Sequence, residues 1–121
     1  MSNIKRKAVL NFYLKKVSYW EDQSFVHDNS EFDVSLVWNS IEEKECNTVL
    51  ISKISKKINI KKEIRLSKYF DIKNANTDYP IIIWNNRIVD GTDRLAKAYI
   101  NNDKYIKVIY ASDKDMLYAL M

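Results

Sequence analysis

Glycine, proline, cysteine and histidine each occur only once in this chain of 121 residues. A single cysteine excludes an internal disulfide, and Cys46 and His27 are too few to build a Cys/His metal site. No window approaches the roughly 20 apolar residues of a membrane-spanning helix, so we expect no membrane partner. We interpret the N-terminus as folded chain of a cytoplasmic protein rather than a leader, because Asn11, Lys15 and Lys16 interrupt its apolar patch.

The composition is that of an ordinary globular protein. Apolar residues make up 46% of the chain and charged residues 30%, which disfavours a disordered chain. A chain of this length buries roughly two-thirds of its unfolded surface without disulfides or metals. Neither a repeat nor a linker rich in Pro, Gly or Ser divides it, so the sequence predicts one domain that spans residues 1–121.

The net charge of +4 is modest, but the positive charge is concentrated between residues 53 and 68. That stretch holds one acid, Glu63, and the basic residues Lys53, Lys56, Lys57, Lys61, Lys62, Arg65 and Lys68. One interpretation is a solvated helical face, because isoleucines recur between the cations at near-helical spacing. The other is a surface that faces nucleic-acid phosphates, because nucleic-acid binders cluster Lys and Arg on one face.

Patterning in the first two thirds of the chain predicts short elements. Residues 9–20 are aromatic and β-branched, which is compatible with strands or a helix. Asp33 has the position of an N-cap for a helix that starts at Val34, and residues 47–51 favour a short strand. Loops are expected where polar residues dominate, at residues 21–24, 27–30 and 67–78.

A β-hairpin is predicted directly after Pro80. Two β-rich runs, residues 81–84 and 87–89, are separated by Asn85 and Asn86. Asparagine tolerates left-handed φ, so this pair predicts a hairpin with a primed turn.

A helix and a strand are predicted to follow the hairpin. The segment from Thr92 to the pair Asn101-Asn102 is rich in helix formers. Residues 104–110 alternate with the period of a half-buried strand. Strand, turn, helix and strand form a βαβ unit, and we expect its second strand to lie parallel to its first by a right-handed crossover. Ser112 then has the position of an N-cap for a C-terminal helix.

The only glycine, Gly91, stands where a β-rich run ends and a helix begins. The first N–H groups of a helix have no intrahelical partner and its macrodipole is positive there, so this end attracts anions. Arg94 in the first turn has a planar fork that suits phosphate oxygens, and Thr92 adds a hydroxyl. Asp90 and Asp93 can cap the same N–H groups and would then compete with an anion.

Two interpretations of Gly91 remain open from the residues alone. The glycine either supplies a positive φ for an ordinary turn, or has ordinary φ and leaves room for a phosphate to approach the backbone.

Residues 78–110 resemble the ParB/sulfiredoxin-like superfamily, in which the signature I-x-D-G-x-H-R-L-x-A precedes a phosphate-binding helix. The matching segment here is Ile88-Val-Asp-Gly-Thr-Asp-Arg-Leu-Ala-Lys-Ala98. The resemblance implies an α+β, single ParB/sulfiredoxin-like domain with a small mixed sheet, a C-terminal β-hairpin–helix–strand unit and flanking helices. It also implies that the turn binds nucleotide phosphates through Asp90, Gly91, Thr92, Asp93 and Arg94.

Two positions depart from the pattern of the superfamily. Sulfiredoxins carry a catalytic cysteine directly after the glycine, where this chain has Thr92, so we do not expect sulfinic-acid reductase activity. Many relatives have histidine before the arginine, where this chain has Asp93. A carboxylate beside a phosphate is repulsive, so Asp93 either points away as a cap, binds Mg²⁺ together with a nucleoside triphosphate, or marks a site that has lost its ligand.

Two functions follow as hypotheses. The first is a nucleotide- or phosphate-binding domain that uses the turn of residues 90–94, with hydrolysis of the nucleotide or phosphoryl transfer as a secondary role for which no second catalytic group is identifiable. The second is a nucleic-acid- or protein-binding module that modulates a host complex. Its binding surface would be the basic residues between 53 and 68, and its phosphate site would be vestigial.

Overall fold

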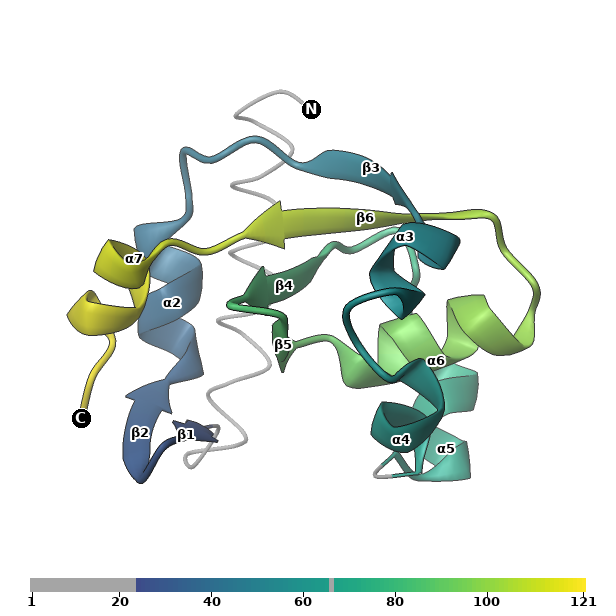
Figure 1. Ribbon diagram of the computed structural model, residues 1–121, viewed down its shortest axis with the longest axis horizontal. Coiled ribbons are helices and arrows are strands. Elements are labelled where there is room, and N and C mark those ends of the chain that lie inside the picture. The colour runs from purple at the N-terminus through teal and green to yellow at the C-terminus, as the bar shows by residue number, and fades with distance from the viewer. Residues whose placement is uncertain (1–23, 66) are drawn as a thin grey trace. The chain divides into compact units, whose positions relative to one another are not determined.

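The computed structural model describes residues 24–65 and 67–121 (Figure 1). The elements expected at residues 9–20 lie outside the described residues. Within them, helices combine with a two-stranded and a four-stranded sheet, which confirms the α+β class, and no helix has both the length and the apolar character needed to cross a membrane. The described residues divide into two compact units: the terminal unit, which comprises residues 24–45 and Ala111–Met121, and the central unit, Cys46–Tyr110.

The terminal unit contains an antiparallel hairpin formed by β1 (Ser24–His27) and β2 (Ser30–Asp33). Asp28 and Asn29 connect the strands with φ values of 49° and 65°. Positive φ at both central residues is what a primed hairpin turn requires, and Asn and Asp adopt it more readily than other side chains.

The loops predicted at residues 21–24 and 27–30 are wrong at Ser24, His27 and Ser30, which belong to these strands, and right at the turn of residues 28–29. Residues 21–23 lie outside the described residues. Each strand buries one phenylalanine, Phe25 or Phe32, and the centroids of the two rings lie 6.2 Å apart. Because each strand has only one buried residue, the sequence shows no alternation of apolar and polar residues there, and its polar residues predict a loop instead.

Two capped helices, α2 (Val34–Ser40) and α7 (Asp113–Tyr118), complete the terminal unit. The Asp33 side chain accepts a hydrogen bond from the backbone N–H of Ser35 at 2.9 Å, and Ser112 begins α7 with a capping box. Both N-caps predicted from the sequence are confirmed.

A buried carboxylate, that of Asp115, links α7 to α2 and the residues that follow it. It accepts hydrogen bonds from the hydroxyl of Ser40 at 2.6 Å and from the backbone N–H of Ser112 at 2.8 Å, and it forms an ion pair with Lys44. Burial raises the pKa of Asp115, but Lys44 and the hydrogen bonds from Ser112 and Ser40 outweigh burial and lower the pKa from 3.8 to about 2. The folded protein therefore favours the ionised form of this group.

We expect Asp115→Asn to lower the free energy of unfolding by roughly 2 kcal/mol at neutral pH, because the charged acceptor of several hydrogen bonds is lost. Folding lowers the pKa of Asp115, so its contribution is fully present above the ordinary value of 3.8 and is lost as the pH falls toward about 2. Urea unfolding at a series of pH values measures this effect.

The difference in unfolding free energy between wild type and Asp115→Asn should shrink across that pH range. Lys114→Ala, an exposed position on the same helix, is the control and should change stability by less than about 0.5 kcal/mol. A difference that stays constant from neutral to strongly acidic pH would contradict this account.

The central unit is built on a mixed sheet with strand order β3-β6-β4-β5. The strands are β3 (Asn47–Leu50), β4 (Ile81–Trp84), β5 (Arg87–Asp90) and β6 (Tyr105–Tyr110). β4 and β5 form the predicted hairpin, in which Asn85 and Asn86 have φ values of 50° and 58°. β6 lies antiparallel to β3 and parallel to β4, the first strand of the hairpin. β5, the strand directly before α6, is antiparallel to β4, so the predicted parallel arrangement holds for β4 and is wrong for β5.

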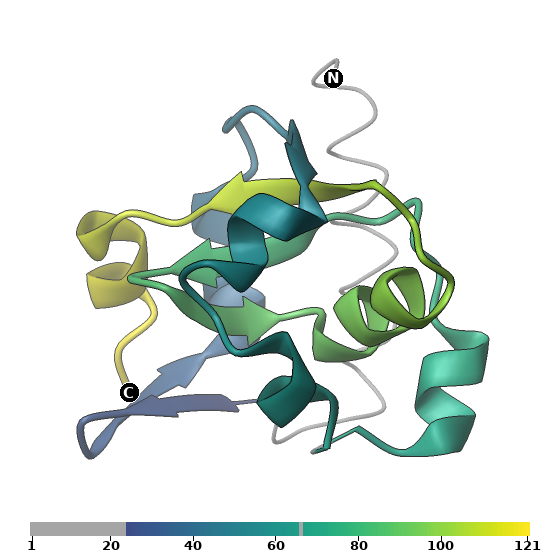
Figure 2. The same ribbon diagram turned by 45° about the vertical axis from the view of Figure 1, so that its right-hand side comes forward.

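Short helices surround one core in the central unit. They are α3 (Ile51–Ser55), α4 (Ile60–Ile64), α5 (Tyr69–Asn74) and α6 (Thr92–Ile100). Isoleucines of α3 and α4 are buried together with apolar residues of the sheet and of α6, as their near-helical spacing predicts. Each such side chain stabilises the fold by roughly 1.5–3 kcal/mol relative to an exposed one. Both α4 and α5 pack against α6 (Figure 2).

The helix α5 contradicts the loop predicted at residues 67–78 over Tyr69–Asn74, whereas residues 67–68 and 75–78 are loop as predicted. None of its residues is buried, so no apolar face marks the helix in the sequence. Lys97 of α6 donates hydrogen bonds from Nζ to the carbonyls of Lys73 at 3.0 Å and Ala75 at 2.8 Å. A cation at a helix C-terminus satisfies carbonyl groups that the helix leaves unpaired. A tertiary contact, rather than a local pattern, thus stabilises α5.

Candidate functional site

The turn between β5 and α6 requires glycine. Gly91 has a φ of 101° and a ψ of 20°, a left-handed conformation that other residues rarely adopt. A Cβ at this position would lie 2.6 Å from Cγ2 of Ile81 and 3.0 Å from Nη2 of Arg94, so there is no room for one. The interpretation in which Gly91 has ordinary φ is therefore wrong, and the space beside it is filled by protein atoms.

The guanidinium of Arg94 lies over Gly91 and reaches Asp90, the last residue of β5. Its Nη2 donates a hydrogen bond to Oδ2 of Asp90 at 3.2 Å, and both side chains are only 17% exposed. The Nε of Arg94 is buried, and no acceptor in the described part of the chain takes its hydrogen bond. Leaving a buried donor unpaired costs roughly 1–3 kcal/mol, so Arg94 is incompletely satisfied.

All five residues predicted for the phosphate site lie in this one turn. Thr92 and Asp93 form the first turn of α6 and are partly buried, as are Asp90 and Arg94. The ion pair between Asp90 and Arg94 is the feature that the sequence analysis missed, because it treats the aspartate as a cap and the arginine as directed toward a ligand. Their spacing of four residues is typical of ion pairs on a helix and was the one signal for this pairing in the sequence. The signal is weak because Asp90 belongs to a strand and only Arg94 to the helix.

The basic residues predicted as a nucleic-acid surface are all exposed, on α3, α4 and the segments beside them. They are Lys53, Lys56, Lys57, Lys61, Lys62, Arg65 and Lys68. The structure brings three of them, Lys56, Lys57 and Lys61, to the lining of one hollow of about 420 Å³. The basic stretch is thus a solvated face, as one of the two interpretations of the sequence predicts, and three of its lysines also line a hollow.

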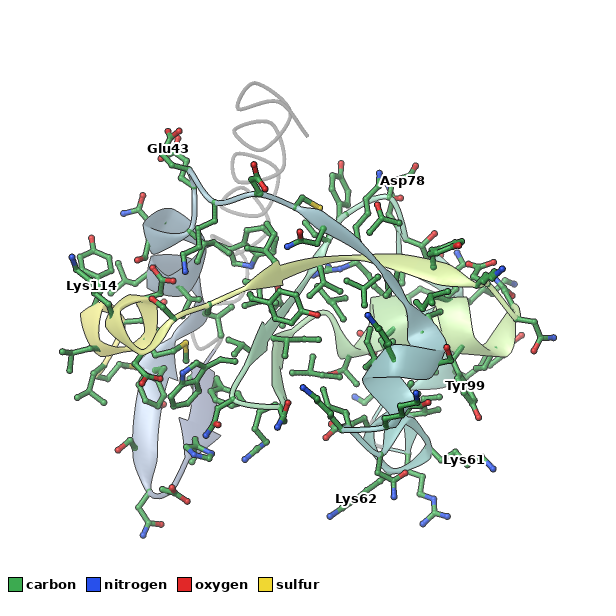
Figure 3. All side chains as sticks on the ribbon, turned by 45° about the horizontal axis from the view of Figure 1, so that its top comes forward. Glu43, Lys61, Lys62, Asp78, Tyr99 and Lys114 are labelled. Atoms are coloured by element: carbon green, nitrogen blue, oxygen red, sulfur yellow. The ribbon has the colours of Figure 1, made fainter. Side chains whose placement is uncertain are left out.

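The basic hollow, as we call this space, also contains residues that sequence reasoning did not single out. Ser55, Asn59 and Tyr99 line it beside the lysines. Tyr99 comes from α6, and Figure 3 shows it close to Lys61 of α4. The helical spacing of Tyr99 with buried residues of α6 indicates a core position, so only the packing of α4 against α6 reveals its place in the hollow.

The single cysteine and the single histidine do not belong to the turn. Cys46 immediately precedes β3, which is at the opposite edge of the sheet from β5. His27 belongs to the terminal unit, where its Nε2 lies 3.2 Å from Oδ2 of Asp28. Among residues 24–65 and 67–121, no group of three or more His, Cys, Asp or Glu side chains is placed to hold a metal ion.

Comparisons of this sequence with models of known protein families, with curated proteins and with solved structures found no match.

We expect Gly91→Ala to lower the free energy of unfolding by roughly 2–4 kcal/mol, because left-handed strain adds to overpacking against Ile81. Denaturant unfolding of the variant measures this loss. In the double variant with Ile81→Ala, removal of Cγ2 relieves part of the clash, so the combined loss should be smaller than the two separate losses together. A Gly91→Ala protein as stable as the wild type would contradict the proposed packing.

Proposed function

We propose that the central unit binds a phosphate-bearing ligand, a nucleotide, at the turn of residues 90–94. The observation that carries the proposal is the Nε of Arg94, a charged donor that is buried without an acceptor at the N-terminus of α6. Guanidinium groups pair strongly with phosphate oxygens, and the helix dipole favours an anion at this end. Because Nε is buried in the free protein, a bound phosphate would complete the hydrogen bonding of the arginine once the side chain turns to expose this atom.

Asp90 acts as the internal competitor of that phosphate. Its carboxylate already accepts a hydrogen bond from Nη2 of Arg94 at 3.2 Å and compensates the positive charge. A phosphate that approaches the guanidinium meets both the attraction of Arg94 and the repulsion of Asp90. The affinity is therefore the difference between two opposing interactions, and removal of the carboxylate should increase it.

The same turn is the one through which the resemblance to the ParB/sulfiredoxin-like superfamily suggests nucleotide binding. The order of hairpin β4–β5, helix α6 and parallel strand β6 agrees with the unit that the resemblance implies. We extend the proposal to a ParB/sulfiredoxin-like fold and to a nucleoside triphosphate with Mg²⁺ as the ligand. Asp93 would then supply a carboxylate to the ion, because Mg²⁺ is commonly held by one or two carboxylates and the substrate phosphates.

The proposal is for binding rather than for a reaction. Hydrolysis or phosphoryl transfer needs a group that positions the attacking nucleophile as well as groups that hold the phosphate. Neither the single cysteine nor the single histidine belongs to the turn.

Isothermal titration calorimetry with ATP, CTP, GTP and inorganic pyrophosphate, each with Mg²⁺, tests this function. Arg94→Ala should weaken binding by roughly 10- to 150-fold, because a charge-assisted contact is lost. Arg94→Lys keeps a positive charge beside Asp90 and should bind with an affinity between those of Arg94→Ala and wild type. Asp90→Asn should bind more tightly than wild type.

Arg87→Ala, an exposed arginine in the same unit, is the matched control and should bind like wild type. Circular dichroism of each variant separates a loss of binding from a loss of structure. No heat for any of the ligands at millimolar concentration, or equal affinities of wild type and the folded Arg94→Lys variant, would contradict the proposal.

A further inference from the structure

The basic hollow is a second concave site, and the proposed function of the turn does not use it. Lys56, Lys57 and Lys61 bring three positive charges to one space of about 420 Å³. A volume of this size is within the range of roughly 300–1,000 Å³ that ligand pockets occupy. Lysines around a concave space attract anions, and each phosphate that they contact releases counterions. The electrostatics of the hollow thus favour a phosphate group.

The hollow also contains groups suited to a nucleobase. Tyr99 is partly buried against the core of the central unit and lines the hollow, so its ring has a fixed position. Asn59 accepts a hydrogen bond at its side-chain oxygen from the backbone N–H of Lys62 at 3.1 Å, which orients its amide. An aromatic ring and an oriented amide beside cations can hold a base as well as its phosphate.

Two exposed aromatic side chains follow the same basic stretch. Tyr69 and Phe70 at the start of α5 are 80% and 72% exposed, and the exposed cations Arg65 and Lys68 precede them. Adjacent large aromatic side chains that are this exposed often mark an interaction surface. Both α4, which carries Lys61, and α5, which carries the two rings, pack against α6, so the hollow and the rings belong to the same unit.

We propose that the basic hollow and the aromatic pair Tyr69–Phe70 bind a single-stranded nucleic acid. Lys56, Lys57 and Lys61 hold backbone phosphates, and bases stack on the aromatic rings. Cationic grooves combined with exposed aromatic residues are how proteins bind single strands without sequence preference. A duplex keeps its bases stacked inside and cannot offer them to the rings, so the single strand is the preferred form.

Fluorescence anisotropy with a labelled oligothymidylate and with a duplex of equal length, over a series of salt concentrations, tests the proposal. Three phosphate contacts to a single strand predict a slope of about −2 for log K against log salt. Lys56→Glu/Lys61→Glu should weaken binding at least tenfold and make the slope shallower by about 1.4. The control variant Lys104→Glu/Lys114→Glu has the same net charge as the test variant, but its two exposed lysines do not line the hollow. It should keep nearly all of the affinity and the salt slope of the wild type.

The aromatic contribution has a different signature. Tyr69→Ala/Phe70→Ala should weaken binding by roughly 5- to 150-fold while the salt slope stays unchanged, because stacking releases no counterions. Both side chains are highly exposed, so the variant should fold normally. Tyr118→Ala, at an exposed tyrosine of the terminal unit, is the control and should bind like wild type.

Three results would overturn the proposal: no binding of the single strand at 50 mM salt, tighter binding of the duplex, or equal losses in the test and control variants. Arg94→Ala should leave oligothymidylate binding unchanged, because the turn is a separate site. Failure of nucleotide binding at the turn is therefore distinguishable from failure of single-strand binding at the basic hollow.

Discussion

The central unit depends on a place where no side chain fits. At Gly91 the backbone is left-handed, Ile81 of β4 packs directly against it, and the guanidinium of Arg94 lies over it. Any other residue would push the isoleucine or the arginine away and would be strained in its own backbone. This close approach lets β5 turn directly into α6, so the hairpin and the helix can share one core.

The helix that this turn begins connects the rest of the unit. Leu95 and Ala98 of α6 are buried in the core, while Lys97 satisfies carbonyl groups at the end of α5. Arg94 stands at the beginning of the helix and Tyr99 near its end, so both proposed binding sites draw on residues of α6. A substitution that shifts this helix would therefore affect both sites, whereas replacement of Lys56, Lys57 or Lys61 would affect only the hollow.

The parts of the fold that could be predicted from the sequence are those set by local chemistry. Asn85 and Asn86 determine the hairpin turn, and Asp33 and Ser112 each cap the helix that follows them. The helix α5 could not be predicted, because its C-terminus is stabilised by Lys97 from another helix. The strands β1 and β2 could not be predicted either, because each buries a single phenylalanine and shows no alternating pattern.

The candidate sites divide in the same way. The turn of residues 90–94 could be located from the position of one glycine between a β-rich run and a helix, since its residues are adjacent in the sequence. The pairing of Arg94 with Asp90 is indicated in the sequence only by their spacing of four residues, because it depends on how the guanidinium folds back over Gly91. The place of Tyr99 in the basic hollow likewise depends on the packing of α4 against α6.

The central claim is that a phosphate completes the hydrogen bonding of Arg94. Nuclear magnetic resonance of the arginine Nε–H groups during a titration with pyrophosphate observes that bond directly. The account predicts that the Nε–H resonance of Arg94 shifts on saturation and that its exchange with water slows, because the buried donor gains an acceptor. An Arg94 resonance that stays unchanged while pyrophosphate shifts the resonances of other cationic side chains would contradict it.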